Sequence, residues 1–337
     1  MRLFRTLYLL SLAGWLGAAP ALPSQAEPLE LSIVQRGLDP AQPDLTRVGR
    51  LEFRGALEIT SKHPDFGGLS ALEVDSQGRA FMAVSDRGHW VSGTLTYDER
   101  GWLSGLEDAE IGPLLDPLGG RLEHKAVQDA EALALLPDGS LLVAFERWHR
   151  IWRYAGSPMP LAEPPTSWPT PDGLEALPDN YGIEAMTALA DGAVLAIAET
   201  ETETGRFPAW LWRDCAEQSH AQRCGDWQRL SYRRTGAYRP SGAALLPDGD
   251  LLVLERRFSW LGGLAARLVR VPATAVAPGA LLEGEELAVL TPPLLTDNWE
   301  GVSAATGPDG ETLIYLVSDD NFMPLLRNLV ALFVLPR

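Results

Sequence analysis

Five stretches of the chain share one pattern of polar and apolar positions. Each begins with a polar and a small residue, continues as an apolar run, turns at a Gly-containing pair, and returns as a second apolar run that ends on an acid. The stretches begin at Gly68, Asp129, Gly182, Pro240 and Asn298. Two apolar runs joined by an Asp-Gly turn are typical of a β-hairpin, in which both turn residues of a type I′ turn need positive φ. The pattern therefore predicts five hairpins.

The hairpins recur at a nearly constant spacing. The first polar positions, Ser70, Glu131, Glu184, Ser241 and Glu300, are 61, 53, 57 and 59 residues apart. The terminal acids, Asp86, Glu146, Glu199, Glu255 and Asp319, are 60, 53, 56 and 64 residues apart. A repeat of this length holds about four short strands, which is one blade of a β-propeller. We expect an all-β propeller of four-stranded blades, with five blades favoured and six as the alternative.

The two ends of the chain are expected to close this ring. A strand over residues 50–59 is predicted to pair with a C-terminal strand over residues 328–335, which removes two exposed sheet edges. The segments RIWRY and RLVRV are candidates for third strands, and the Pro-rich stretch 158–178 is predicted to be an excursion between strands. Residues 27–337 are therefore expected to form a single domain.

The N-terminus has the pattern of a signal peptide over residues 1–26. Arg2 and Arg5 precede an apolar core over residues 7–16, which is too short to span a bilayer, and small residues suit cleavage after Ala26. The alternative is an uncleaved membrane anchor. We expect a protein exported to the periplasm or secreted, with no membrane span in the mature chain.

The two cysteines, Cys215 and Cys224, are predicted to form a disulfide after export. A zinc site needs about four ligands, and only His220 lies close to them in the sequence. A disulfide closing this polar loop is favoured in an oxidising compartment.

The formal net charge of the chain is −17. A surface this acidic repels phosphate backbones, which argues against nucleic acid as a partner. Cations remain candidates, as does a small molecule held at a locally basic position, and we expect a monomer.

Acids are placed symmetrically about three of the five turns. Glu131 lies seven residues before Asp138, and Glu146 lies seven after Gly139. With a two-residue loop, equal arms place the two acids directly opposite each other. The same arithmetic gives the pairs Glu184–Glu199 and Glu300–Asp319. In the other two hairpins a serine replaces the first acid, and the second acid is displaced by one residue, which a β-bulge could absorb.

We expect these acids to converge at the end of the central channel away from the turns. Close carboxylates share a proton, meet an arginine, or bind a cation. Ca²⁺ suits such a ring because it accepts six to eight oxygen ligands in loose geometry. The alternative is a ring neutralised by neighbouring arginines. The predicted Ca²⁺ ligands are Glu131, Glu146, Glu184, Glu199, Glu300 and Asp319.

Arginines follow the acids of three hairpins, at Arg87, Arg147 and Arg256. The planar fork of an arginine can bind two oxygens of a phosphate or carboxylate. We therefore predict that Arg87 and Arg256 act in catalysis together with Glu131 and Glu184. The predicted substrate-binding residues are Asp86, Arg147, Glu255, Asp320 and Asn321.

Eight short motifs occur in a fixed order from about residue 50 to the C-terminus. They are GGLSAL, SDRG, DAEAL, GIEAM, PSG, ER, NWEG and SDDNF. In this order they resemble the phytase-like domain family, whose members are described as having esterase-like activity of phytase. The resemblance implies a propeller fold in an exported bacterial protein and hydrolysis of a phosphate ester or another ester. The motifs characteristic of calcium-dependent β-propeller phytases are not found in this sequence.

Two classes of function follow from these observations. In the first, carboxylates from several blades hold Ca²⁺, and the cation and an arginine bind the phosphoryl group of an ester. A carboxyl-ester or lactone substrate is a variant of this hypothesis. In the second, the same ring serves a non-catalytic propeller scaffold that binds a ligand or an ion.

Overall fold

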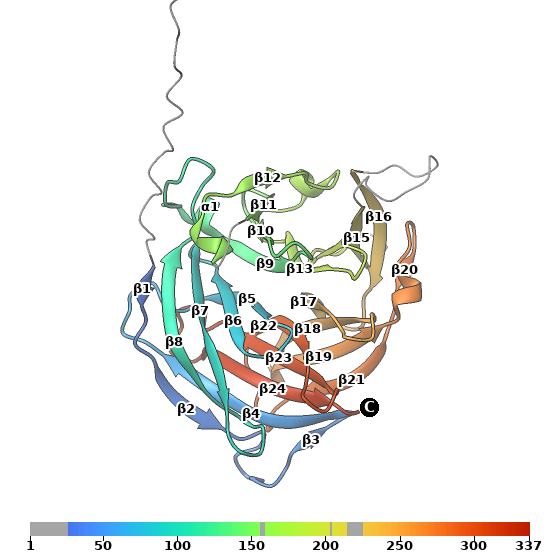
Figure 1. Cartoon of the computed structure of the whole chain (residues 1–337). Helices are drawn as coiled ribbons and strands as arrows, with labels where there is room; N and C mark the ends of the chain where they lie inside the picture. Colours follow the sequence, from blue (N-terminus) through green and yellow to red (C-terminus); the bar gives the residue numbers. More distant parts are fainter. Residues whose placement is uncertain (1–25, 156–158, 203, 214–224) are drawn as a thin grey trace, which may run out of the picture.

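Five β-sheets are arranged around a common axis in the computed structural model (Figure 1). The structure describes residues 26–337, apart from 156–158, 203 and 214–224. Each sheet is one blade, and its first strand along the hairpin repeat lies closest to the axis. The predicted five-bladed propeller is confirmed. The signal peptide and the Cys215–Cys224 disulfide fall on residues outside those described.

The first three blades are built as follows, from the axis outward. The first contains β5 (Leu69–Val74), β6 (Ala80–Ser85), β7 (His89–Tyr97), β8 (Leu103–Pro113) and β1 (Glu27–Pro28). The second contains β9 (Ala130–Leu135), β10 (Leu141–Phe145), β11 (Arg150–Tyr154) and β12 (Thr166–Trp168). The third contains β13 (Ile183–Ala188), β14 (Val194–Ala198), β15 (Arg206–Arg213), β16 (Asp226–Arg233) and β20 (Leu281–Leu282).

The remaining two blades complete the ring. The fourth contains β17 (Arg239–Leu245), β18 (Leu251–Ser259), β19 (Gly263–Val271) and β21 (Glu285–Leu290). The fifth contains β22 (Trp299–Thr306), β23 (Thr312–Ser318), β24 (Leu329–Leu335), β4 (Leu51–Thr60) and β2 (Ser32–Arg36), with β3 (Arg47–Val48) beside β4. Short helices occur at α1 (Lys125–Gln128), η1 (Pro160–Ala162), η2 (Leu174–Ala176) and η4 (Ala273–Ala275).

The predicted closure of the ring is confirmed. β4, near the N-terminus, pairs antiparallel with the C-terminal strand β24, so the fifth blade uses both ends of the chain. Phe53 of β4 and Phe333 of β24 lie opposite each other, and their rings meet at 5.5 Å. Both rings are buried between the fourth and fifth blades, because alternate residues of these strands face the neighbouring sheet.

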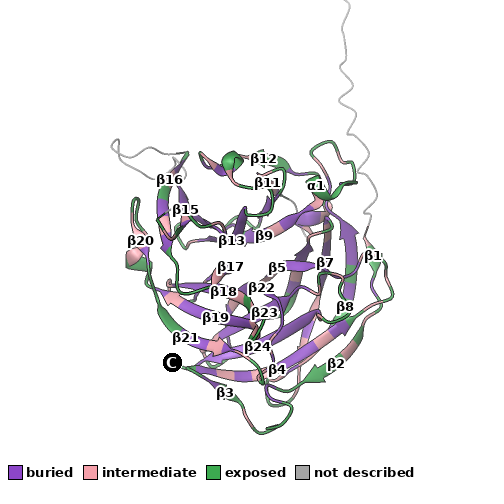
Figure 2. Ribbon diagram, turned by 180° about the vertical axis from the view of Figure 1, so that it is seen from behind, coloured by how far each residue is buried: buried purple, intermediate pink, exposed green. Residues whose placement is uncertain are grey.

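Burial is continuous along the inner strands and fades toward the outer strands (Figure 2). β10, β14 and β24 are buried at every residue, which explains why they appear in the sequence as unbroken apolar runs. The Pro-rich excursion 158–178 returns to the second blade and supplies its fourth strand, β12. No helix in the described part of the chain is long and apolar enough to cross a membrane.

The predicted type I′ turns are wrong. In the second blade Gly139 has φ +82°, but Asp138 is not among the residues with positive φ. The N–H of Gly139 donates to Leu136 O, and the N–H of Leu136 donates to Ser140 O, both at 2.9 Å. This is a three-residue loop in which only the glycine needs the left-handed conformation. It moves the register by one residue, so that Ala132 faces Ala144.

A β-bulge then appears at the same place in all five inner hairpins. In the second blade Ala132 pairs with Ala144 and Ala130 pairs with Phe145, so Glu131 is the extra residue. The equivalent residues in the other blades are Ser70, Glu184, Ser241 and Glu300. The two acids of a hairpin are therefore not directly opposite each other, which corrects the equal-arm geometry. Glu146 instead donates its backbone N–H to Asp129 O at 2.8 Å.

Candidate functional site

The bulges bring acids from four blades together at one end of the central channel. Repulsion acts between carboxylates of different blades, including Glu131 with Glu184, Glu184 with Glu300, and Asp319 with Asp86. We call this end the acidic mouth, defined by Asp86, Asp129, Glu131, Glu146, Glu184, Glu199, Glu300 and Asp319. The six acids predicted to converge are all among these residues.

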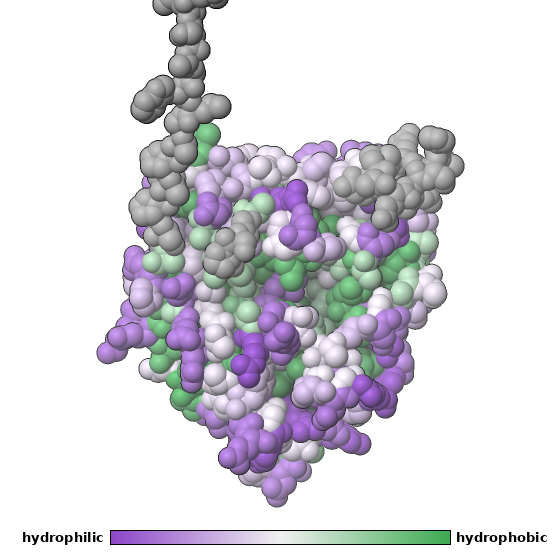
Figure 3. Space-filling model, in the orientation of Figure 1, coloured by the Kyte–Doolittle hydropathy of each residue, from purple (hydrophilic) through white to green (hydrophobic). Residues whose placement is uncertain are grey.

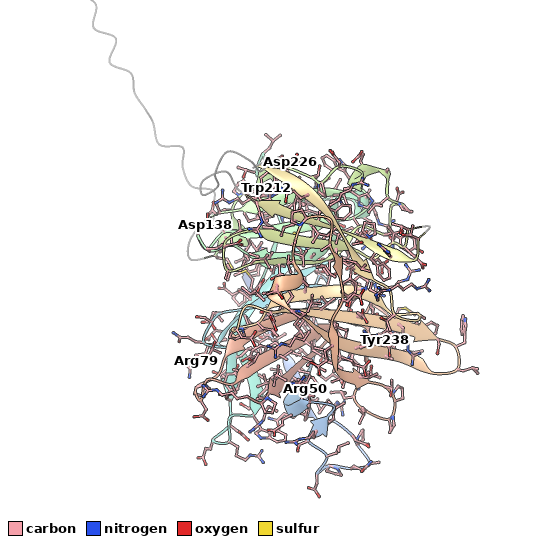
Figure 4. All side chains as sticks on the ribbon, turned by 90° about the vertical axis from the view of Figure 1, so that its right-hand side faces the viewer. Arg50, Arg79, Asp138, Trp212, Asp226 and Tyr238 are labelled. Carbon is pink, nitrogen blue, oxygen red and sulfur yellow. The ribbon has the colours of Figure 1, made fainter. Side chains whose placement is uncertain are left out.

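The Asp-Gly turns lie at one end of the channel, which we call the turn end. The acidic mouth lies at the opposite end. In Figure 4, Asp138 and Arg79, which belong to hairpin turns, lie on the left, and Tyr238, which leads into the mouth end of β17, lies on the right. Figure 1 views the molecule from the turn end and Figure 2 from the mouth. In the space-filling view of the turn end, hydrophilic residues cover the lower edge around β3 (Figure 3).

In the fourth blade an arginine occupies the position that holds an acid in the others. In four blades, the acid that follows the second strand donates its backbone N–H to the carbonyl two positions before the bulge residue of the inner strand. These acids are Asp86, Glu146, Glu199 and Asp319. The residue at this register position in the fourth blade is Arg256, which pairs with Arg239. Glu255, aligned with the acids by sequence, pairs one step earlier with Pro240 and points elsewhere.

Arg256 is the shared counter-ion of one half of the mouth. Its Nε lies 2.6 Å from Glu300 Oε2, and its Nη2 lies 3.5 Å from Glu199 Oε2 and 3.6 Å from Glu184 Oε2. Three carboxylates from two other blades therefore meet one guanidinium. The acids in turn raise the pKa of Arg256, so it stays charged despite its burial.

The other half of the mouth is organised around Asp129. Three carboxylates converge here. One carboxylate oxygen from each of Asp129, Glu131 and Glu146 lies within 4.8 Å of the other two. Lys125 forms ion pairs with Asp129 and Asp86, the latter at 2.7 Å, and Arg147 Nε lies 2.5 Å from Asp129. Glu146 accepts the backbone N–H of Gly182.

Glu131 has neither a hydrogen bond nor an ion pair with any described residue. Removal from water and the nearby carboxylates raise its pKa well above the usual range. Burial likewise raises the pKa of Glu146 and of Glu300 to about 8 and that of Asp319 to about 7. The described cations are too few for this many carboxylates, so the mouth retains protons near neutral pH or takes up a cation.

The donor set suits a hard cation such as Ca²⁺. Ca²⁺ binds carboxylate oxygens in flexible geometry, and three carboxylates from one blade already converge. Of the predicted ligands, Glu131 and Glu146 belong to this group. Glu184, Glu199 and Glu300 contact Arg256, whereas Asp129 and Asp86 contact Lys125, so the mouth is divided into two halves and both contain more carboxylates than cations.

Backbone strain is concentrated at the mouth. Four non-glycine residues in the described chain have positive φ, and three of them, Arg147, Asn321 and Phe322, follow acids of the mouth. Such conformations cost on the order of 1–3 kcal/mol each and tend to occur at binding and catalytic sites. Asn321 and Phe322 are held by their backbone N–H groups, which donate to Asp319 and Asp320 at 2.6 and 3.1 Å.

The structure gives the predicted substrate-binding residues different surroundings. Asp86 is at the mouth, and Arg87 beside it stacks on the Phe322 ring at 3.2 Å. Asp320 holds the loop together by accepting from Gly68 N and Asn328 Nδ2. Its carboxylate is therefore committed to the protein.

Glu255 lies outside the mouth. Its Oε1 accepts the Tyr232 hydroxyl at 2.7 Å, and its Oε2 lies 3.2 Å from Arg267 Nε. Both partners belong to outer strands of the third and fourth blades. The carboxylate of Glu255 therefore binds side chains between the third and fourth blades. Arg256 occupies the position in the mouth that was expected for Glu255.

Two residues of the site were not predicted from the sequence. Asp129 occupies the position of Asn298 in the repeat, two residues before the bulge acid, and DAE and NWE are visibly equivalent. Lys125 lies four residues before Asp129, the spacing of neighbours on one helix face. That spacing could have predicted the ion pair between Lys125 and Asp129.

Residues of all five blades meet below the mouth around a small cavity. One cavity there has a volume of about 10 Å³ and is lined in part by Glu184, Ser241 and Glu300. This volume is close to that of a single water. This cavity is too small for an ester ligand.

A family model described as "Phytase-like: Esterase-like activity of phytase" matches residues 64–322 of the chain. The match spans all five bulges and the residues of the mouth. No curated protein is similar enough to count as a match.

Solved propellers resemble the chain distantly. A PQQ-bound aldose sugar dehydrogenase from Streptomyces coelicolor is 12% identical with a TM-score of 0.45, over 91% of this chain and 99% of that one. An inactive virginiamycin B lyase from Staphylococcus aureus, bound to quinupristin, is 11% identical with a TM-score of 0.40, over 91% and 100% of the two chains. A candidate gluconolactonase is 11% identical with a TM-score of 0.44, over 92% and 96%. These similarities are too low to transfer any chemistry.

Proposed function

This chain belongs to the phytase-like family, and from that premise we propose that it hydrolyses a phosphate ester, or another ester, at the acidic mouth. We further propose that a divalent cation, most suitably Ca²⁺, is held by Asp129, Glu131 and Glu146. The observation that carries the proposal is the division of the mouth. Arg256 supplies counter-charge to one half, whereas Glu131 in the other half contacts no cation among the described residues.

A bound divalent cation would polarise the ester and neutralise charge that develops on its oxygens. The residues of the chain supply the rest of the site. Arg87 and Arg147 stand beside the carboxylate group, and their guanidinium forks suit the oxygens of a phosphate or carboxylate. The stacking of Arg87 on Phe322 limits its rotamers and so presents its fork in a defined direction.

Proton transfer is assigned to the carboxyls with raised pKa values. Burial and the neighbouring acids raise the pKa of Glu184 well above its usual range, which favours its protonated form. An acid in this state can donate to the leaving oxygen of an ester. Arg256 contacts the same carboxyl and would position it.

The test combines metal-dependent stability with ester turnover. Ca²⁺ should raise the melting temperature of the metal-free protein progressively, as expected when a ligand binds only the folded state. Glu131→Gln should remove this gain and abolish metal-dependent hydrolysis of a chromogenic phosphate ester. Glu73→Gln is the matched control, because Glu73 is a half-buried acid with a raised pKa that lies near the turn end, and its substitution should leave both readouts unchanged.

The outcomes separate the two classes of function. Turnover of phosphate or carboxyl esters that a chelator removes and Ca²⁺ restores supports the hydrolase and identifies its substrate class. A Ca²⁺ response that Glu131→Gln eliminates, without turnover of either ester class, supports the non-catalytic ion-binding scaffold instead. If neither Ca²⁺ nor other divalent cations stabilise the protein, the metal site is wrong.

We also propose that the protein is exported after removal of residues 1–26 and that Cys215 and Cys224 are then linked. N-terminal sequencing of protein from the native host should begin at Glu27. Alkylation of the mature protein followed by mass spectrometry should find both cysteines protected. An intact Met1 on cytosolic protein, or two free thiols, would contradict the respective proposal.

A further inference from the structure

Exposed apolar side chains are concentrated on one face of the molecule. Ten large apolar residues are exposed in the described part of the chain, and seven of these are more than half exposed. All seven lie on the mouth side of the molecule, six of them on loops and Phe258 near the end of β18. Single exposed apolar residues are ordinary, but this one-sided distribution is not expected of a face that meets only water.

Four of the seven come from loops of three different blades. Trp148 lies in the loop between β10 and β11, which begins at the mouth residue Glu146. Met323 and Leu325 lie between β23 and β24, in the loop that begins at Asp319. Leu118 lies in the segment between β8 and α1, ahead of the strand that carries Glu131.

The other three lie on the hairpin formed by β18 and β19. Beyond Arg256 this hairpin continues for three more residue pairs, ending at Ser259 and Gly263, which carries its tip roughly 10 Å past the level of the acids. Its end extends beyond Tyr238 in Figure 4. At the tip Trp260 is 93% exposed and Leu261 fully exposed, and the Phe258 ring meets Trp260 at 5.4 Å.

Two arginines without acidic partners lie on the same face. Arg87 stacks on Phe322 at 3.2 Å and Arg257 on Tyr238 at 5.2 Å, and neither forms an ion pair with a described carboxylate. In a chain with a net charge of −17, two such arginines on one face are available to anionic groups. Phosphate is a suitable partner for their guanidinium forks.

We propose that the mouth face docks on a lipid surface of zwitterionic phospholipid, with Trp260 and Leu261 inserted among the acyl chains. Tryptophan is favoured at the boundary between headgroups and acyl chains, and exposed apolar side chains on a surface contribute binding by their buried area. Arg87 and Arg257 would meet headgroup phosphates. The acids of the mouth would disfavour a strongly anionic surface.

The spacing of the apolar side chains favours lipid over a protein partner. They project from separate segments of the first, second, fourth and fifth blades. A fluid amphiphile accommodates separate tips, whereas a protein partner would need a complementary surface for each. Resting on the hydrolase proposed above, this docking implies that the substrate is an amphiphilic ester presented at the interface.

The experiment measures vesicle binding and turnover separately on the full chain. Flotation is performed with vesicles of phosphatidylcholine and with vesicles that also contain phosphatidylglycerol. The Trp260→Ser/Leu261→Ser double variant is compared with a Leu135→Ser control, because Leu135 is exposed and pairs with Leu141 beside the Asp138–Gly139 turn, at the turn end. Hydrolysis of a soluble ester is measured for each protein.

We expect the wild type to bind phosphatidylcholine vesicles more tightly than the anionic ones. The tip variant should lose about tenfold or more of its partition coefficient, because two large apolar side chains no longer leave water. The control should bind like the wild type, and soluble-ester turnover should be unchanged in both variants.

Other outcomes overturn the docking or separate it from catalysis. Absence of vesicle binding by the wild type, or equal binding by the tip variant, overturns the lipid surface. A dimer in light scattering that the tip substitutions dissociate identifies a second copy of the chain as the occupant and likewise overturns it. Tip-dependent binding without any ester turnover supports the docking and contradicts only the hydrolase.

Discussion

Arg256 offers the sharpest test of the acidic mouth. Arg256→Met removes the guanidinium that contacts Glu300, Glu199 and Glu184 while keeping a long apolar side chain. The three carboxylates remain buried and lose their shared counter-ion. We expect a large loss of stability whose size increases with pH.

The magnitude follows from the geometry. At 2.6 Å from Glu300, and with an effective dielectric constant of about 20, one ion pair has a gross attraction of about 6 kcal/mol. Most of this attraction is offset by the cost of burying both charges, and removing one partner of a buried pair typically costs about 3–5 kcal/mol. We expect a decrease of this size in the free energy of unfolding at pH 9.

The pH dependence has a defined sign. Burial raises the pKa of Glu300 in the folded protein to about 8, although Arg256 lowers it. Because this pKa is raised on folding, the protonated carboxyl contributes to the free energy of unfolding at low pH. That contribution is lost as the pH rises through about 8. Without Arg256 the pKa of Glu300 rises further. Each additional pKa unit adds about 1.4 kcal/mol to the cost of ionising this carboxyl in the folded protein. The loss at pH 5 should therefore be smaller than the loss at pH 9.

The assay is urea unfolding followed by tryptophan fluorescence, with chelator present, at pH 5 and at pH 9. Arg270→Met is the matched control, because Arg270 also meets two acids, Asp248 at 2.6 Å and Asp250 at 2.7 Å, but on the exposed turn end. It should cost under about 1 kcal/mol at both pH values. Equal losses in the two variants, or a loss for Arg256→Met that shrinks as the pH rises, would refute the reasoning.

Three further predictions concern the ring, the turn end and the closure. Arg256→Glu gives all five blades an acid at the same register position, so Ca²⁺ should raise the melting temperature of this variant more steeply than that of the wild type; a parallel response would contradict the division of the mouth. Burial raises the pKa of Glu73 to about 7, and its stabilising protonated form is lost as the pH rises through that value. Glu73→Gln should therefore be more stable than the wild type at pH 9 by about 1–3 kcal/mol in urea unfolding, with no gain at pH 4. Phe333→Ala, in the strand that closes the ring, should cost about 3–5 kcal/mol, and a cost below 1 kcal/mol would mean that the closure contributes little.

Much of the architecture was predictable because it is encoded locally. Apolar runs flanking a Gly-containing turn define each hairpin within about 20 residues, and their repetition indicates blades. The pairing of residues 50–59 with residues 328–335 spans the whole chain, yet it followed from the same logic, since an open ring would leave two strand edges unpaired. The convergence of the acids then followed from blade symmetry.

The side chain that faces the channel was decided by register. Successive residues of a strand point to opposite faces, so a shift of one residue exchanges Glu255 for Arg256. That shift depends on the three-residue turns and on the bulges at Ser70, Glu131 and their equivalents. Spacing counts alone could not distinguish a two-residue from a three-residue loop around the same Asp-Gly pair.

The chain by itself therefore determined the repeat, a propeller of five or six blades, the closure and the clustering of acids. Only the tertiary structure decided that the ring contains an arginine, that this arginine contacts Glu184, Glu199 and Glu300, and that Asp129 with Lys125 belongs to the site. The physical reason is one of range. Hairpins are specified by neighbours in sequence, whereas the charge balance of the mouth depends on which side chains of different blades meet across the axis.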